Sequence, residues 1–201
     1  EEYVAGHEEE ADALVALARL YAGAPVAADV RKASTTLTKA LILEPANAEA
    51  LRELIAVRMQ ERNFADALAL IDRYLTLRQG DAAVLYEKAR ILASRPDQRG
   101  DAIDLLDAAI ATDDQLAYRQ LRGFLNLVTE QYAEALADFQ QIADATPTTS
   151  AVLDISLAEA HLGLGQSDIA RGFFQAARRQ HSDGQPVDNE RMEAVARELG
   201  E

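Results

Sequence analysis

The chain has 201 residues, of which 34 are acidic and 20 are basic, and its formal net charge is −14 at pH 7. This balance argues against a general binder of nucleic acids or anionic membranes, because both targets are polyanions. It suits a soluble protein, either for solubility alone or for contact with a basic partner. The absence of cysteine excludes disulfides, thiolate chemistry and cysteine-based zinc sites.

The composition favours helix along the whole chain, in one domain or two. Alanine occurs 40 times, whereas there are five prolines and no tryptophan. No apolar run approaches the roughly 18 residues of a membrane span, so we expect no direct membrane insertion. The sequence begins Glu1-Glu2-Tyr3 without a methionine, so we expect a processed or trimmed fragment, with cytoplasm and periplasm both open as its compartment.

Apolar residues at offsets of three and four predict a succession of amphipathic helices. Residues 1–8 are polar, and we expect them to be frayed. The first helix begins near Glu9 and ends before Pro25, which disfavours helix at the preceding residue. Asp113 or Asp114 is expected to cap a later helix. The other helices are expected over residues 28–43, two within 48–81, then 81–94, 101–112, 114–129, 132–145, 150–164, 166–180 and 186–199.

The strongest signal in the sequence is a period near 34 residues. An alanine recurs early in the second helix of each pair, then a large apolar residue four positions later, then a mostly small residue three positions further on. Such a column suits closely packed antiparallel helices. The alanines are Ala33, Ala67, Ala102, Ala135 and Ala170; the large residues are Leu37, Ile71, Leu106, Phe139 and Phe174; the last set is Ala40, Tyr74, Ala109, Ile142 and Ala177.

A helix–turn–helix unit with this period resembles the tetratricopeptide repeat family. In the most regular unit the matching residues are Leu51, Leu54, Phe64, Ala67 and Ile71. The small residue expected in each first helix corresponds to Ala18, Ile55, Ala89, Gly123 and Ala158, whereas Lys88 and Arg122 stand where the family usually has a leucine.

The resemblance implies an all-α fold, a right-handed α-solenoid or superhelix of five helix pairs. The expected pairs span residues 9–45, 46–80, 81–113, 114–147 and 148–182, followed by a capping helix over 186–199. A terminal cap with a polar outer face keeps the last repeat solvated.

No pattern in the sequence supports catalysis. The three histidines His7, His161 and His181 lie in different parts of the chain, and there is no HExxH zinc motif. Phosphate-binding GxxxxGK[ST] and dinucleotide-binding GxGxxG motifs are also missing. We therefore expect no catalytic residue, no metal and no cofactor.

In tetratricopeptide repeats the first helix of each unit lines the concave side of the superhelix, which implies a groove for a partner. Arg19, Arg52 and Arg90 would form a basic ladder that fixes acidic groups of a ligand. Alternatively, they pair with acidic residues of neighbouring helices, such as Asp12, Glu49 or Glu53. The full set of expected groove residues is Arg19, Arg52, Met59, Tyr86, Arg90, Phe124, Leu127, Val128, Val152, Ile155 and Leu162.

The carboxy-terminal half of this groove is apolar, and Phe124, Val128 and Ile155 would accept apolar side chains. The helix over 150–164 is apolar on two sides, and such a helix is normally covered on both. The cover is either the terminal helix over 186–199, which we favour, or an apolar segment of a partner, or a second copy of this chain in a homodimer.

We therefore expect a protein–protein interaction scaffold or adaptor that holds a peptide or helix of a partner protein in its concave groove. Two alternatives remain open. One is a self-associating structural module of a larger bacterial-type assembly, related to the cell envelope or to secretion. The other is a non-catalytic domain of a larger enzyme.

Overall fold

The computed structural model describes the backbone of residues 2–23 and 27–201, and the side chains of these residues apart from 2–5, 8, 27 and 28. In this part of the chain there are α-helices and one 3₁₀-helix but no β-strand, which confirms the all-α prediction. None of these helices is long and apolar enough to cross a bilayer. The predicted break before Pro25 lies outside the described residues.

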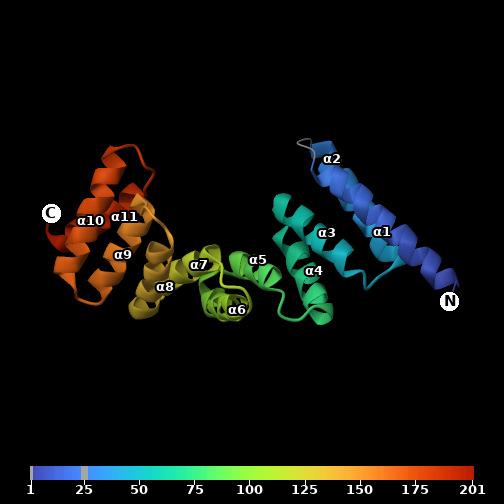
Figure 1. The fold of residues 1–201 in the computed structure, drawn as a ribbon, viewed down its shortest axis with the longest axis horizontal. Helices are drawn as coiled ribbons and strands as arrows, with labels where there is room; N and C mark the ends of the chain where they lie inside the picture. Colours follow the sequence, from blue (N-terminus) through green and yellow to red (C-terminus); the bar gives the residue numbers. More distant parts are fainter. Residues whose placement is uncertain (1, 24–26) are drawn as a thin grey trace. The chain divides into compact units, whose positions relative to one another are not determined.

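The helices group into two compact units, residues 1–91 and 92–201 (Figure 1). The amino-terminal unit contains α1 (Glu2–Ala22), α2 (Ala27–Leu43), α3 (Ala48–Gln60), α4 (Phe64–Leu77) and α5 (Ala82–Leu92). The carboxy-terminal unit contains η1 (Pro96–Gln98), α6 (Arg99–Thr112), α7 (Leu116–Val128), α8 (Tyr132–Ala145), α9 (Ala151–Gly163), α10 (Ser167–Ser182) and α11 (Asn189–Leu199). In chain order, α1, α3, α5, α7 and α9 are the first helices of the period, and α2, α4, α6, α8 and α10 are the second helices.

The periodic column forms the core, as predicted. All five alanines of the column are completely buried, because a side chain larger than a methyl group would keep the two helices apart. The large residues that follow them are at most 2% exposed. Only Ile142, in the last set of the column, remains partly accessible.

Three turns between a first and a second helix share one backbone geometry. Each contains a residue with positive φ: Arg62 (56°), Glu130 (61°) and Gly165 (73°). In each, the next N–H donates to the carbonyl five residues earlier, closing the helix end in a Schellman motif. These bonds run from Asn63 to Arg58 (2.9 Å), from Gln131 to Asn126 (2.8 Å) and from Gln166 to His161 (2.8 Å). The sequence period is therefore also a period in backbone geometry.

Two predicted helix ends differ from the structure. Helix α1 begins at Glu2, earlier in the chain than the predicted start near Glu9. Glutamate is a good helix former, and its charge is favourable near a helix amino terminus. The capping prediction for α7 was wrong, because its N-cap residue is Gln115 and makes no side-chain cap. Asp114 instead accepts from Arg119 Nε at 2.6 Å.

The two departures from the family pattern, Lys88 and Arg122, are both ion-paired with the preceding second helix. Lys88 Nζ lies 2.7 Å from Oδ1 of Asp72, and Arg122 Nη1 lies 2.6 Å from Oδ1 of Asp107. Arg122 also donates to Asp138, and the hydrogen bond to that buried carboxylate raises the pKa of the guanidinium. Ion pairs thus replace an apolar contact at this repeat position.

Candidate functional site

The three arginines of the predicted ladder do not form a row of unpaired cations. Arg19 pairs across to α3, with Nε 2.6 Å from Glu53 and Nη2 3.1 Å from Glu49. Arg90 pairs within its own helix with Glu87 at 2.8 Å, and its guanidinium lies 5.7 Å from the Tyr86 ring centroid. Pairing with neighbouring acids is therefore the arrangement found for Arg19.

Arg52 is exposed and makes no ion pair within the described residues. Met59 and Tyr86, the other predicted groove residues of this unit, are half-buried, and Met59 packs on the core around Ile71. These residues do not line a shared cavity among those found in the described structure.

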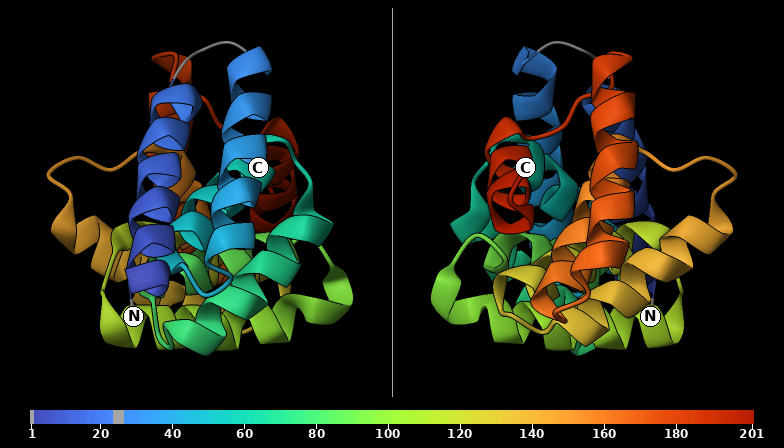
Figure 2. Two further views of the ribbon diagram at one scale, coloured as in Figure 1. Left: turned by 90° about the vertical axis from the view of Figure 1, so that its right-hand side faces the viewer. Right: turned by 90° about the vertical axis from the view of Figure 1, so that its left-hand side faces the viewer.

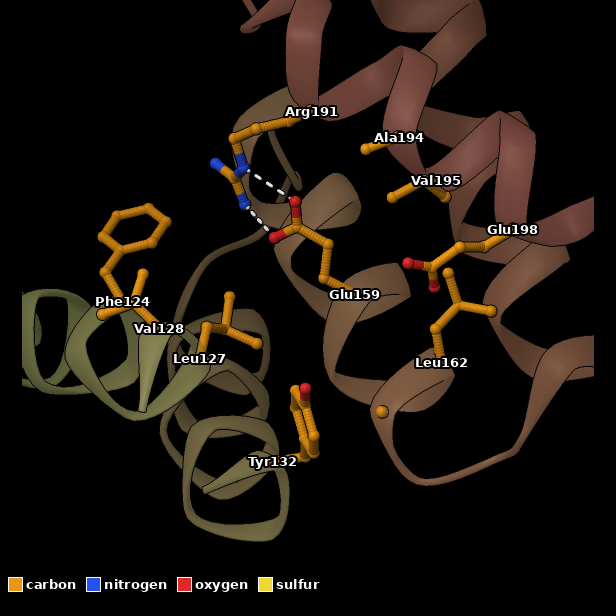
Figure 3. Close-up of a pocket in the computed structure, with 11 residues that line it drawn as sticks. Phe124, Leu127, Val128, Tyr132, Glu159, Leu162, Arg191, Ala194, Val195 and Glu198 are labelled. Atoms are coloured by element: carbon orange, nitrogen blue, oxygen red, sulfur yellow. Dashed lines mark hydrogen bonds and ion pairs between the residues drawn. The ribbon is translucent and has the colours of Figure 1, made fainter. Parts of the chain in front are cut away.

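In the carboxy-terminal unit, four of the predicted groove residues meet around one open cavity of about 440 Å³. Figure 3 shows Phe124, Leu127 and Val128 on one side of it and Leu162 opposite. Tyr132 of α8 closes one end. Helix α11 adds Arg191, Ala194, Val195 and Glu198, and the remaining lining residues are Glu159 and Gly163 of α9.

Helix periodicity explains why these side chains converge. Phe124, Leu127 and Val128 are spaced i, i+3 and i+4, so they form one stripe on α7. Arg191, Ala194, Val195 and Glu198 form the corresponding stripe on α11, and Glu159 and Leu162 lie one turn apart on α9. Most of the cavity lining therefore comes from one face each of α7, α9 and α11, and the spacing of residues along each helix determines that face.

A buttressed ion pair forms the polar rim of the cavity. Arg191 donates through Nε to Glu159 Oε1 at 2.9 Å and through Nη2 to Oε2 at 2.5 Å. The same Nη2 donates to Ser156 Oγ at 2.9 Å, and the guanidinium stands 5.3 Å from the Phe124 ring centroid. A bidentate arginine that also touches an aromatic face is held in one orientation, so this rim is preorganised.

Glu198 lies on α11 at the edge of the same cavity, on the far side from the Arg191–Glu159 pair (Figure 3). Its side chain is exposed and makes no ion pair within the described part of the chain. An apolar wall next to an uncompensated carboxylate accommodates a group with an apolar body and a cationic end.

A second, smaller cavity of about 230 Å³ is also lined by Phe124. Val152, another predicted groove residue, lines it together with Ile142, Leu153 and the polar side chain of Gln120. Phe124 therefore contributes to the lining of both cavities.

Ile155 corrects one prediction. It was expected to receive a partner's side chain, but it is 0% exposed and packs with Phe174, Val195 and Leu199. The reason is that α11 folds onto α9 and α10, so the terminal helix is the cover of this face, as favoured above. The face that remains open is the adjoining one, which Leu162 shares with α7.

The lining residues Tyr132, Arg191 and Glu198 were missed from the sequence. Arg191 and Glu198 are spaced i and i+7 and border the predicted stripe of Met192, Val195, Ala196 and Leu199, whose member Val195 also lines the cavity. Only the docked helix shows that these flanking residues border the cavity.

The geometry offers no metal centre in the described residues, where no group of three or more His, Asp or Glu side chains converges. His161 is 8% exposed, stacks on Phe173 at 5.5 Å, and shares a hydrogen bond with Gln166 at 2.6 Å. These contacts give this histidine a structural role between α9 and α10.

No protein-family model matches the sequence, and no curated protein matches it. Solved structures do match. YrrB, described as a TPR protein with an unusual peptide-binding site, superposes with a TM-score of 0.78 over 98% of this chain and 98% of that chain, at 16% identity. A tetratricopeptide repeat protein from Parabacteroides merdae gives 0.77 over 96% and 74%, at 16% identity. MamA gives 0.74 over 90% and 98%, at 19% identity.

These likenesses extend along nearly the whole chain and agree with the recurring column, the recurring turns and the paired helices. Because the sequence identities are 16–19%, these structural likenesses show the fold alone. The chain therefore has the tetratricopeptide-repeat solenoid fold.

Proposed function

We propose that this chain is a protein-interaction scaffold whose carboxy-terminal unit binds a peptide segment of a partner protein in the cavity between α7, α9 and α11. The observation that supports this is the cavity itself: about 440 Å³, open, apolar on its walls and polar at a preorganised rim. Binding sites for apolar groups with a few fixed polar contacts have this construction.

The volume suits one large side chain of a partner as an anchor. Val128 is 55% exposed at the entrance, and covering it together with Leu127 and Leu162 removes apolar surface from water. Burying one leucine- or phenylalanine-sized anchor contributes about 1.5–3 kcal/mol. A single anchor therefore gives modest affinity, and the smaller cavity beside Phe124 provides a second contact for the same segment.

The charge of the site selects a basic partner segment. Glu198 lies at the edge of the cavity, and residues 92–201 contain 19 acidic and nine basic residues, a formal net charge of −10. A lysine or arginine one turn from the apolar anchor would pair with Glu198. This is a different chemistry from the acidic ligand expected from the amino-terminal arginines, of which Arg19 and Arg90 are already paired.

The neighbours support the general role but not the ligand. YrrB, which shares the fold over nearly its full length, is described as having a peptide-binding site. An all-helical surface with a preorganised cavity, and with no metal-binding group of side chains in the described residues, fits binding better than turnover.

Selection from a random peptide library displayed on phage, with the full chain immobilised, tests the proposal. We expect enriched peptides to carry an apolar residue followed within one helical turn or two extended residues by a lysine or arginine. Val128→Glu should abolish enrichment, because the apolar anchor would have to remove water from the new carboxylate at the entrance without pairing it. Ile169→Glu is the matched control, since Ile169 is 49% exposed on α10 and does not line the cavity.

Enrichment that is equal for the wild type and Val128→Glu would contradict the assignment of the cavity. Enrichment of peptides that lack a basic residue, still sensitive to Val128→Glu, would keep the cavity as the site and reject the role given to Glu198.

A further inference from the structure

A stripe of three residues recurs on the first helices at spacing i, i+4 and i+7. On α3 the stripe is Ala50, Leu54 and Val57, at most 5% exposed and packed in one cluster with the preceding helices α1 and α2. On α9 it is Leu153, Leu157 and Ala160, packed in one cluster with α7 and α8. We call these positions the stacking stripe, because they face the repeat before them.

Helix α5 follows the same rule with one change. Val84 and Ile91, at the first and third positions of its stacking stripe, belong to the cluster formed by α3 and α4. Lys88, at the middle position, pairs with Asp72 of α4. The stacking stripe is therefore covered by the preceding helices whether its middle residue is apolar or charged.

No residue that the structure describes covers the stacking stripe of α1. Its members are Ala13, Leu17 and Leu20, of which Ala13 is exposed, Leu17 is 40% exposed and Leu20 is 75% exposed. The residues at the position of Leu20 on the later first helices are Val57 (2%), Ile91 (4%), Leu125 (4%) and Ala160 (0%). The other side of α1 is already used, since Ala11, Val15 and Ala18 are buried in the core with α2. The left view of Figure 2 shows α1 and α2 side by side.

We propose that the stacking stripe of α1 is a second interaction surface, which binds an amphipathic helix of a partner protein in the manner of the second helix of a further repeat. Continuity with the packing inside the chain supports this occupant. The same three positions receive a helix pair at α3, α5 and α9, so the backbone geometry that accepts a helix is already built.

The residues of the stripe define the chemistry of the partner helix. Leu17 at the middle position requires an uncharged residue opposite, as Thr38 is on α2, rather than the aspartates that face Lys88 and Arg122. Glu10 continues the stripe three residues before Ala13, is exposed, and makes no ion pair within the residues described. A small–large–small apolar column with basic residues beside it therefore complements this surface.

Helix α2 has these properties and supplies a probe. Residues 29–43 contain the column Ala33, Leu37 and Ala40, together with Arg31, Lys32 and Lys39 against a single acidic residue, Asp29. In the chain this helix covers the stacking stripe of α3. Since an isolated helix of this length is marginal in water, the probe is a hydrocarbon-stapled peptide of residues 29–43 with the staple on its polar face.

The test is fluorescence anisotropy of the labelled stapled peptide titrated with the full chain. We expect saturable binding that Leu20→Glu weakens at least tenfold. Leu77→Glu is the matched control, because Leu77 is 43% exposed on α4 and lies outside the stacking stripe of α1. A stapled peptide with Leu37→Glu should not bind. Far-ultraviolet circular dichroism confirms that each variant is folded, which the exposure of Leu20 leads us to expect.

This surface is independent of the cavity, and the experiment keeps them apart. Binding that is absent, or that Leu20→Glu leaves unchanged, overturns the proposal. Loss of binding in Val128→Glu instead would assign the peptide to the cavity and also overturn it. Analytical ultracentrifugation completes the test: dimers of the wild type that Leu20→Glu dissociates would make a second copy the occupant, in place of a partner helix.

Discussion

Gly163 sets the shape of the cavity at the scale of one residue. A β-carbon built on it would lie 2.3 Å from the Tyr132 ring, so only glycine lets the end of α9 approach α8 this closely. Gly123 plays a similar part against Phe139, with a nearest distance of 2.9 Å. The sequence shows the two glycines but not this role, because the ring that each one meets comes from another helix.

We predict that Gly163→Ala destabilises the chain by about 1–3 kcal/mol, since Tyr132 must move to make room for the methyl group. Urea unfolding followed by circular dichroism measures the change. Gly172→Ala provides the comparison, because a β-carbon there meets nothing within 4 Å and the residue is inside α10. That variant should be more stable than the wild type by about 0.5–1 kcal/mol. Equal effects of the two substitutions would refute the steric argument.

Asp154 makes stability depend on pH. It is 2% exposed and accepts from Gln180 Nε2 at 2.9 Å and Thr149 Oγ1 at 3.2 Å, both at Oδ2. Burial is the main cause that raises the pKa of this carboxyl above its ordinary 3.8, and the two hydrogen bonds oppose the shift without cancelling it. The folded state therefore binds this proton more tightly than the unfolded state does.

The contribution of Asp154 to stability is accordingly full below pH 3.8 and is lost as the pH rises through the folded-state pKa. Asp154→Asn keeps an oxygen for both donors and cannot ionise. We predict that the stability of the variant relative to the wild type increases from pH 3 to pH 7, as measured by urea unfolding at each pH. A difference that stays constant over this range would contradict the prediction.

At the scale of elements, ion pairs join α6, α7 and α8. Asp138 on α8 is 0% exposed and receives Arg122 Nη2 at 2.6 Å and Arg119 Nη1 at 3.1 Å. Both arginines also reach exposed aspartates, Asp107 and Asp114. Asp138 is the central member of this network, because its charge has no access to water and depends wholly on its two partners.

We predict that Asp138→Ala costs about 3–5 kcal/mol of unfolding free energy, because it leaves two arginine side chains without their buried partner. Asp72→Ala, which removes the exposed partner of Lys88, should cost about 0–1 kcal/mol. Chemical denaturation of both variants tests the contrast. A small effect at Asp138 would mean that water replaces the carboxylate at this site.

Helix α11 shows the limit of prediction at this scale. Its amphipathic stripe and its length indicate a cap, and α11 does pack with α9 and α10. The stripe does not specify which side of α9 becomes covered, so Ile155 was placed in the groove although it is buried. Repeat periodicity determines which residues face inward within a helix pair, whereas the docking of a non-repeating helix depends on contacts that no period marks, such as that of Arg191 with Glu159.

At the scale of the whole molecule, the fold was predictable because each pair buries the same column, so five copies of one pattern support one another. The functional site was less predictable from the sequence than the fold. Phe124, Leu127, Val128 and Leu162 were identified because α7 and α9 are repeat elements. The fate of Arg19 stayed open between two alternatives, because sequence separation of 30 and 34 residues does not reveal that Glu49 and Glu53 lie within 3.1 and 2.6 Å.

The net charge of the carboxy-terminal unit affects peptide binding as a whole, because residues 92–201 have a formal net charge of −10. We predict that peptides with an apolar anchor and a lysine bind less tightly as NaCl is raised from 0.05 to 0.5 M, by about three- to tenfold, because the ions screen attraction between exposed charges. Anisotropy titrations give the slope of affinity against salt. Glu198→Gln should reduce this slope, and an unchanged slope would argue against contact between Glu198 and the peptide.

The pairs Lys88–Asp72 and Arg122–Asp107 have a consequence for how the repeats are ordered. The position of Asp72 and Asp107 holds Thr38 on α2 and Gln140 on α8. A first helix with a basic residue at this junction therefore follows a second helix with an aspartate there. Helix α3 has Leu54 at the corresponding position, and it follows α2, which has the neutral Thr38. Removing the repeat over 46–80 would place Lys88 opposite Thr38 without a counter-ion. Removing the repeat over 81–113 would place Arg122 opposite Asp72. The repeats are matched at their junctions, so a repeat can be removed without leaving an unpaired cation only where the new junction again joins a basic residue to an acidic one.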